Sequence, residues 1–135
     1  MKKYLDKNVL VAARERIGLA FDKTERQYVS FSGGKDSTVM LHLVMGEAKK
    51  RKKKIGLLFI DLEAQYKITI DHVQECFDMY SELIEPFWVS LPIHLRNAVS
   101  VYSPFWKCWD KKRKEMWVRN FPKKSIKDET HFPFF

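Results

Sequence analysis

The sequence predicts an α/β protein with a mainly parallel sheet and helices on both faces. Helical and strand-like hydrophobic periods alternate over residues 5–91, a glycine pair joins one strand to the next helix, and the run at 55–60 is nearly continuously apolar. Alternation of this kind predicts parallel strands joined by right-handed crossovers. An uninterrupted apolar strand is typical of a sheet that is covered on both faces.

The first half of the chain predicts a helix, a strand and a second helix. Apolar residues recur every three or four positions over 5–21, and the segment 27–31 is a short apolar strand. A second helical stripe starts at Asp36 and runs into six consecutive cations at 49–54. Cations suit the solvated end of a helix, because they complement its dipole. A nucleic-acid patch is the alternative interpretation.

The next elements are a strand at 55–60, a helix at 67–81 and a strand at 87–89, whose start Pro86 limits. Ligands of parallel sheets bind beyond the carboxyl ends of the strands. Ser32 and Asp61 each follow a strand directly, so we expect both at that edge. The regular pattern fades after Leu91. We interpret 92–135 as a less regular aromatic and basic extension of a single domain spanning 1–135.

Composition excludes several classes of protein. A hydrophobic fraction of 45% is too high for a disordered chain, and no run approaches the ~20 apolar residues of a membrane span. Cys76 and Cys108 lie 32 positions apart without a CxxC pair, so we expect buried or idle thiols in a cytosolic, cytoplasmic protein. The formal net charge of +8 predicts attraction to polyanions such as nucleotides.

The segment Ser32–Ser37, of sequence SGGKDS, carries the clearest chemistry. Gly33 and Gly34 allow a tight turn and the close approach of a ligand to the backbone. The turn and the following helix point N–H groups at one spot, which suits a phosphate. The serines add hydroxyl donors and Lys35 adds a cation. Asp36 would repel phosphate, so we expect it to cap the helix or to help hold Mg²⁺.

Two common nucleotide motifs are excluded. A Walker A loop needs a glycine five positions before Gly34 and Ser or Thr after Lys35, where this chain has Val29 and Asp36. The GxGxxG pattern is absent as well. The hexapeptide nevertheless lies between a predicted strand and a predicted helix, which predicts a phosphate-binding loop and an adenine nucleotide as its ligand.

The hexapeptide after a strand resembles the PP-loop of the ATP pyrophosphatase (adenine nucleotide alpha-hydrolase-like) superfamily. More narrowly, residues 31–43, 58–61 and 63–66 resemble the phosphoadenosine phosphosulfate (PAPS) reductase-like family. Within it, the chain is similar to uncharacterised bacterial proteins of the immunoglobulin-binding regulator A type. The resemblance continues in four further segments, at 84–86, 97–101, 108–110 and 132–134.

The resemblance implies an HUP-like three-layer sandwich that holds ATP by its phosphates, with Mg²⁺ and with adenine near the second strand. By position, it implies contacts to phosphate or Mg²⁺ from Ser32, Gly33, Gly34, Asp36 and Ser37. Lys35 occupies the variable position of the loop, and Asp61 the post-strand position that faces the nucleotide. Asp36 and Asp61 are therefore the candidate catalytic residues, and Asp36 is the candidate metal ligand.

The sequence departs from the family in its thiols and its length. PAPS reductases use a cysteine near the carboxyl end, and this chain has none after Cys108. We therefore do not expect sulfonate reduction by this chain alone. It is also shorter than the family members it resembles, which suits a truncated gene, a natural short form or a subunit. No histidine is singled out as catalytic.

The leading hypothesis is a transferase-like enzyme that cleaves ATP between its α- and β-phosphates, adenylylating a substrate or serving sulfur-related transfer. The alternative is a non-catalytic nucleotide-binding or regulatory module acting with DNA or a partner protein. Residues 92–135 hold Trp106, Trp109 and Trp117 among cations, which suits either nucleic acid or an inward-packed helix. With the apolar end at 132–135, this segment predicts a homodimer or a complex with a second protein.

Overall fold

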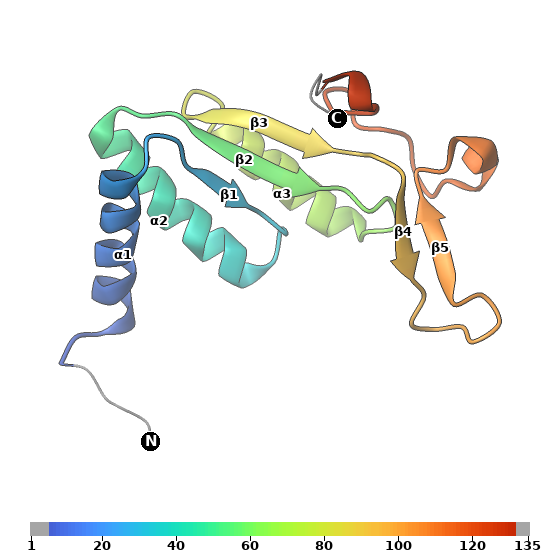
Figure 1. Ribbon diagram of the computed structural model, residues 1–135, viewed down its shortest axis with the longest axis horizontal. Helices are drawn as coiled ribbons and strands as arrows, with labels where there is room; N and C mark the ends of the chain where they lie inside the picture. The colour runs from blue at the N-terminus through green and yellow to red at the C-terminus, as the bar shows by residue number, and fades with distance from the viewer. Residues whose placement is uncertain (1–5, 132–135) are drawn as a thin grey trace.

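The computed structural model describes residues 6–131, and its first six elements alternate as expected (Figure 1). They are α1 (Val9–Lys23), β1 (Tyr28–Ser30), α2 (Lys35–Arg51), β2 (Ile55–Ile60), α3 (Lys67–Met79) and β3 (Ile84–Val89). The first helix begins later than the sequence predicted, at Val9. Asn8 caps it by accepting a hydrogen bond from the Val11 N–H at 2.9 Å.

The three strands form one parallel sheet in the order β1-β2-β3. Val29 pairs with Leu57, and Leu57 with Pro86. An α/β protein with a parallel sheet flanked by helices was predicted, and this class is confirmed. The carboxyl ends of the strands lie together at one edge of the sheet, where the chain leaves β1 for the loop before α2 (Figure 1).

The third strand was predicted from residue 87, which was wrong because β3 already begins at Ile84. Pro86 is tolerated inside it for a geometric reason. The Trp88 carbonyl and the Ser90 N–H both bond to Ile126, on the side of β3 away from β2. Alternate residues of a strand bond to the same side. Pro86 lies two residues before Trp88, so its backbone also faces away from β2, and its missing N–H removes no bond to β2.

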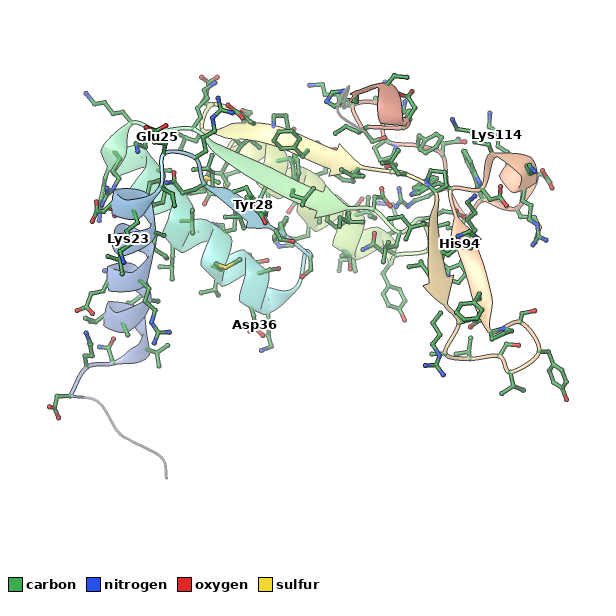
Figure 2. All side chains as sticks on the ribbon, viewed as in Figure 1. Lys23, Glu25, Tyr28, Asp36, His94 and Lys114 are labelled. Atoms are coloured by element: carbon green, nitrogen blue, oxygen red, sulfur yellow. The ribbon has the colours of Figure 1, made fainter. Side chains whose placement is uncertain are left out.

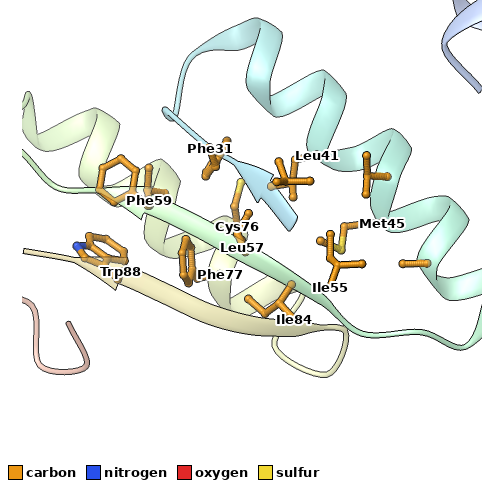
Figure 3. Packing of buried hydrophobic residues seen from close by; sticks show 14 of the residues in the cluster. Phe31, Leu41, Met45, Ile55, Leu57, Phe59, Cys76, Phe77, Ile84 and Trp88 are labelled. Carbon is orange, nitrogen blue, oxygen red and sulfur yellow. The ribbon is translucent and has the colours of Figure 1, made fainter. Parts of the chain in front are cut away.

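The hydrophobic core lies between one face of the sheet and the helices (Figure 3). Leu57 and Phe59 of β2 are almost completely buried there. Helix α2 contributes Leu41 and Met45, and α3 contributes Val73, all of them buried as well. The spacing of these residues explains the pattern, since every second strand residue and every third or fourth helix residue faces this layer.

The opposite face of the sheet is more open. Tyr28, which Figure 2 labels, is 72% exposed, and Ile60 is 44% exposed. Between β1 and β3, Gly56 keeps this face flat: a Cβ there would lie 3.0 Å from the Tyr28 Cβ and 3.4 Å from Phe87. The apolar run of β2 predicted cover on both faces of the sheet, but only one face is fully covered: Ile55, Leu57 and Phe59 are buried, whereas Leu58 is half-buried and Ile60 is exposed.

Residues after Leu91 are more regular than the sequence predicted. β4 (Ile93–Arg96) and β5 (Phe105–Cys108) form an antiparallel hairpin, and two 3-10 helices follow, η1 (Lys111–Met116) and η2 (Glu129–His131). We predicted no strand here. The two strands have four residues each, too few for a clear alternation, and a proline directly precedes each of them.

Candidate nucleotide-binding site

The loop after β1 requires glycine at its second position. Phe31 still donates to the Leu58 carbonyl at 2.8 Å, so the strand pairing extends to the start of the loop. Gly33 then adopts φ = +76°. A Cβ at Gly33 would lie 2.8 Å from Val73 Cγ2 and 2.9 Å from Thr69 Cγ2 of α3. Backbone conformation and close packing therefore both exclude a side chain here.

Gly34 is different, because nothing in the described protein requires it to be glycine. It precedes α2 with φ = −82° and ψ = 163°, angles that other residues adopt readily. The nearest atom to a Cβ built there is Ser32 Oγ, at an ordinary 3.4 Å. The absent side chain leaves open space directly in front of the helix. This suits the close approach of a ligand.

Hydroxyl groups hold the loop in shape. The Gly34 carbonyl accepts from Ser37 Oγ and from Thr38 Oγ1, each at 2.9 Å. Ser32 Oγ lies 2.9 Å from Ser37 Oγ, which links the two ends of the hexapeptide. These bonds fix the backbone before any ligand arrives, so a ligand would not have to order it.

The start of α2 offers unpaired donors. Among the described residues no side chain caps the helix, and the N–H groups of its first turn, as in any helix, have no intrahelical acceptor. Free N–H groups and the helix dipole favour an anion at this point. Lys35 and Asp36 lie beside it, with side chains 90% exposed and paired with each other at 2.9 Å. An exposed pair is weak, so both side chains remain available to a ligand. Figure 2 labels Asp36 at the start of α2.

A histidine that the sequence did not single out supports the loop from α3. Thr38 donates to the Gly34 carbonyl, so His72 Nε2, 2.9 Å from Thr38 Oγ1, is the donor in their contact. His72 Nε2 also lies 3.8 Å from the Cys76 sulfur. Burial raises the pKa of the Cys76 thiol, which keeps this thiol neutral. Thr38 and His72 are 34 residues apart in sequence, and only the fold brings them together.

Asp61 follows β2 as predicted, but its side chain is completely buried. Trp88 Nε1 donates to its Oδ2 at 2.8 Å. The other carboxylate oxygen accepts from the Glu63 N–H at 3.0 Å and from the guanidinium of Arg119. Both oxygens therefore have protein partners. This geometry favours a structural position for Asp61 over the nucleotide-facing position that the sequence suggested.

Glu63 completes this buried cluster and was not predicted from the sequence as a site residue. Its carboxylate accepts from the Trp109 N–H at 2.5 Å and from the Val118 N–H at 3.3 Å. Its carbonyl accepts from Arg119 Nε at 2.9 Å, and the Trp109 indole donates to the Asp61 carbonyl at 2.6 Å. The end of β2 thus anchors a segment that lies about 50 residues later in the chain.

The aromatic residues of that segment pack on one another. Trp109 is fully buried, stacks on Phe121 at 4.6 Å and meets Trp117 edge-on at 5.3 Å. The guanidinium of Arg119 lies 5.0 Å above the Trp109 ring. The sequence left two interpretations of these tryptophans, nucleic-acid binding and inward packing on a helix. Inward packing fits Trp109, although Trp109 lies outside the α-helices.

Comparison with known proteins decides the family. The family model for the phosphoadenosine phosphosulfate reductase domain matches residues 26–121, a span that includes the loop and the buried cluster. The chain belongs to this family. A PAPS reductase domain indicates a nucleotide-related function.

One relative of this PAPS reductase-like domain is the uncharacterized protein YbdN of Escherichia coli (strain K12), 46% identical over 129 residues. The alignment covers 95% of this chain, which spans only about 31% of the relative's length. No solved structure matches the chain. Within the described residues, no helix has the length and apolar character needed to cross a membrane.

A metal at the loop would depend on few protein ligands. Among the described residues, no three His, Cys, Asp or Glu side chains gather into a metal site. Mg²⁺ commonly takes one or two carboxylates and completes its shell with phosphate oxygens and water. Asp36, exposed in the first turn of α2, fits that limited role.

Proposed function

We propose that this PAPS reductase-like domain binds ATP with Mg²⁺ at the Ser32–Ser37 loop. The observation that carries the proposal is Gly34, which neither backbone angle nor packing requires and which leaves open space before uncapped N–H groups. A phosphate fits that space and those donors. Lys35 would add positive charge, and Asp36 would hold Mg²⁺, which supplies charge neutralisation between phosphate oxygens.

The proposed reaction is cleavage between the α- and β-phosphates. A nucleophilic atom of an acceptor forms a bond to the α-phosphorus, the bond to the bridging oxygen breaks, and pyrophosphate leaves with the electron pair. The chain's contribution is to orient the triphosphate on fixed N–H donors and to stabilise the developing charge. Sulfonate reduction is not part of the proposal, because Cys76 and Cys108 are both buried.

A second candidate is a module that binds the nucleotide without turning it over. The observation that favours it is Asp61, whose carboxylate already serves Trp88 and Arg119. Asp36 is then the carboxylate of the loop that is free to meet the nucleotide. Pyrophosphate release from labelled ATP separates the candidates, since an enzyme releases it with acceptor present and a binding module never does.

We place the protein in the cytoplasm, where buried cysteines remain reduced thiols.

Two alanine variants test the site itself. Gly34→Ala introduces a methyl group that the protein tolerates, so the variant should fold normally and lose ATP affinity at least tenfold. Gly46→Ala is the matched control: it lies later in the same helix, and nothing within 4 Å would meet its methyl group. Calorimetric titration with Mg²⁺ and ATP measures both. Equal affinities for the wild type, Gly34→Ala and Gly46→Ala would remove the loop from the proposal.

A further inference from the structure

One face of the β4–β5 hairpin carries two cations, a histidine and an aromatic ring. His94 pairs with Lys107 and Arg96 pairs with Phe105, so these four side chains share a face. All four are exposed, Phe105 at 65% (Figure 2 labels His94). The alternate residues, such as Cys108, pack more deeply on the other side. No contact within the described protein explains why a phenylalanine stands beside Arg96 and Lys107 on this exposed face.

A hollow of about 420 Å³ opens beside this face, between the hairpin and η1. Its wall includes three aromatic rings, those of Phe105, Trp106 and Trp117. Lys107 and Arg113 bring positive charge to the same hollow, and Asn97 adds an amide. A flat ring with hydrogen-bonding edges and an attached phosphate matches this combination of rings, cations and amide.

A second hollow, of about 440 Å³, adjoins the first and shares Lys107 and Asp110 with it. Its other cations are Lys111, Lys112 and Lys127. The two hollows therefore form a continuous path along the hairpin and η1, lined by five Lys or Arg side chains against the carboxylates of Glu63, Asp110 and Asp128. A path suits an extended polyanion better than a single small anion.

The charge of the whole chain is concentrated in this region. Residues 105–128 hold nine Lys or Arg against three Asp or Glu, a net charge of +6 out of the chain's +8. Arg119 is occupied by Asp61, whereas Lys107, Lys111 and Lys112 point into solvent unpaired by any salt bridge within the described residues. Such a concentration raises the local density of polyanions and of their phosphates.

We propose that the hairpin and η1 bind single-stranded nucleic acid. Its phosphates lie along Lys107, Lys111 and Lys112, and one base enters the smaller hollow against Phe105. The aromatic wall favours nucleic acid over an acidic polypeptide, because bases stack on rings and carboxylates do not. It favours a single strand over a duplex, because only unpaired bases are free to enter a hollow. The surface is separate from the Ser32–Ser37 loop.

Anisotropy of a labelled single-stranded oligonucleotide of about 12 nucleotides, titrated with the chain at several salt concentrations, tests the proposal. Phe105→Ala should weaken binding about tenfold with the salt slope unchanged, since it removes stacking and no charge. Lys107→Ala should lower the salt slope by about one. The matched controls are Tyr28→Ala, an exposed aromatic on the sheet, and Lys49→Ala, an exposed cation of α2.

Four results would overturn the proposal. They are absence of oligonucleotide binding, equal losses in Lys107→Ala and Lys49→Ala, duplex binding as tight as single-strand binding, and displacement by polyglutamate with no effect of Phe105→Ala. The last would indicate an acidic protein partner instead. Gly34→Ala should leave oligonucleotide binding unchanged, so a failure of ATP binding at the loop is distinguishable from a failure here.

Discussion

Trp88 donates its indole N–H to Asp61 at 2.8 Å, and both side chains are buried at the carboxyl end of the sheet. This bond joins β3 to the residue after β2. The same carboxylate accepts from Arg119, 58 residues later. The family resemblance suggested nucleotide chemistry for Asp61. In the structure its carboxylate instead holds the segment after the hairpin against the end of the sheet.

Replacing Asp61 with Asn should destabilise the protein more than it affects ATP binding. The amide keeps an acceptor for Trp88 but leaves Arg119 without its counter-charge. Removing one partner of a fully buried pair costs about 3–5 kcal/mol. Because the Arg119 side chain stays 21% exposed, we expect a loss of about 2 kcal/mol in the free energy of unfolding, measured by urea denaturation.

Asp22→Asn is the control for this change, because Asp22 pairs with Arg51 at the surface with its side chain 62% exposed. That variant should lose about 0.5 kcal/mol or less. If Asp61→Asn were as stable as the wild type and instead lost Mg²⁺-dependent ATP affinity, Asp61 would belong to the nucleotide site after all.

Asp36 should show the opposite pattern. Its side chain is 90% exposed, so Asp36→Asn should change the free energy of unfolding by about 0.5 kcal/mol at most. Loss of the metal-binding carboxylate should weaken ATP binding about tenfold in Mg²⁺ and leave binding in EDTA unchanged, which corresponds to about 1.4 kcal/mol. Calorimetry in both buffers measures this, with the exposed Asp71→Asn as control. The same Mg²⁺ dependence in wild type and Asp36→Asn would contradict the metal role.

The sequence predicted the alternation of elements and the glycine turn between β1 and α2 because both depend on local signals. An apolar strand, a helical period and a pair of glycines can each be recognised within a few consecutive residues. The partners of Asp61 could not be predicted, because Arg119 and Trp109 approach it only through the course of the chain after the hairpin. Pro86 misled the prediction of β3. A proline is tolerated there only because its backbone faces away from β2, and the sequence does not show which side of the strand is paired.

The two faces of β2 should respond differently to truncation. Leu57 is fully buried in the core between the sheet and helices, whereas Leu58 is half-buried on the opposite face. Leu57→Ala should cost about 2–5 kcal/mol through lost burial and a cavity. Leu58→Ala should cost about 1 kcal/mol. Urea unfolding of both variants measures the difference, and equal losses would mean that the open face is covered in solution.

The buried thiols predict a loss of stability in alkali. Burial raises the pKa of both Cys76 and Cys108. Below the ordinary thiol pKa, about 8.5, folded and unfolded chains are both protonated and stability is at its full value. Above it, the unfolded chain ionises first, so the free energy of unfolding falls as pH rises through the folded pKa values. Urea unfolding between pH 8 and 10 checks this, together with thiol labelling that should be slow until the chain unfolds. Rapid labelling of the folded protein at pH 8 would contradict it.

Self-association through the segment after Leu91 stays a prediction. The apolar end at 132–135 lies outside the described residues, but the loop between β4 and β5 adds evidence. Val99, Val101 and Tyr102 are 94%, 87% and 96% exposed there. Apolar side chains gathered in one exposed segment often mark an interface.

We therefore expect light scattering at micromolar concentration to give twice the chain mass of 16.1 kDa. Removing residues 132–135, or replacing Val99 and Val101 with serine, should return the protein to a monomer, because each change takes apolar surface from the segment. A wild-type monomer would exclude self-association and leave a foreign partner. A dimer that survives both changes but is dissolved by Ile60→Lys would move the interface to the open face of the sheet, where Ile60 is 44% exposed.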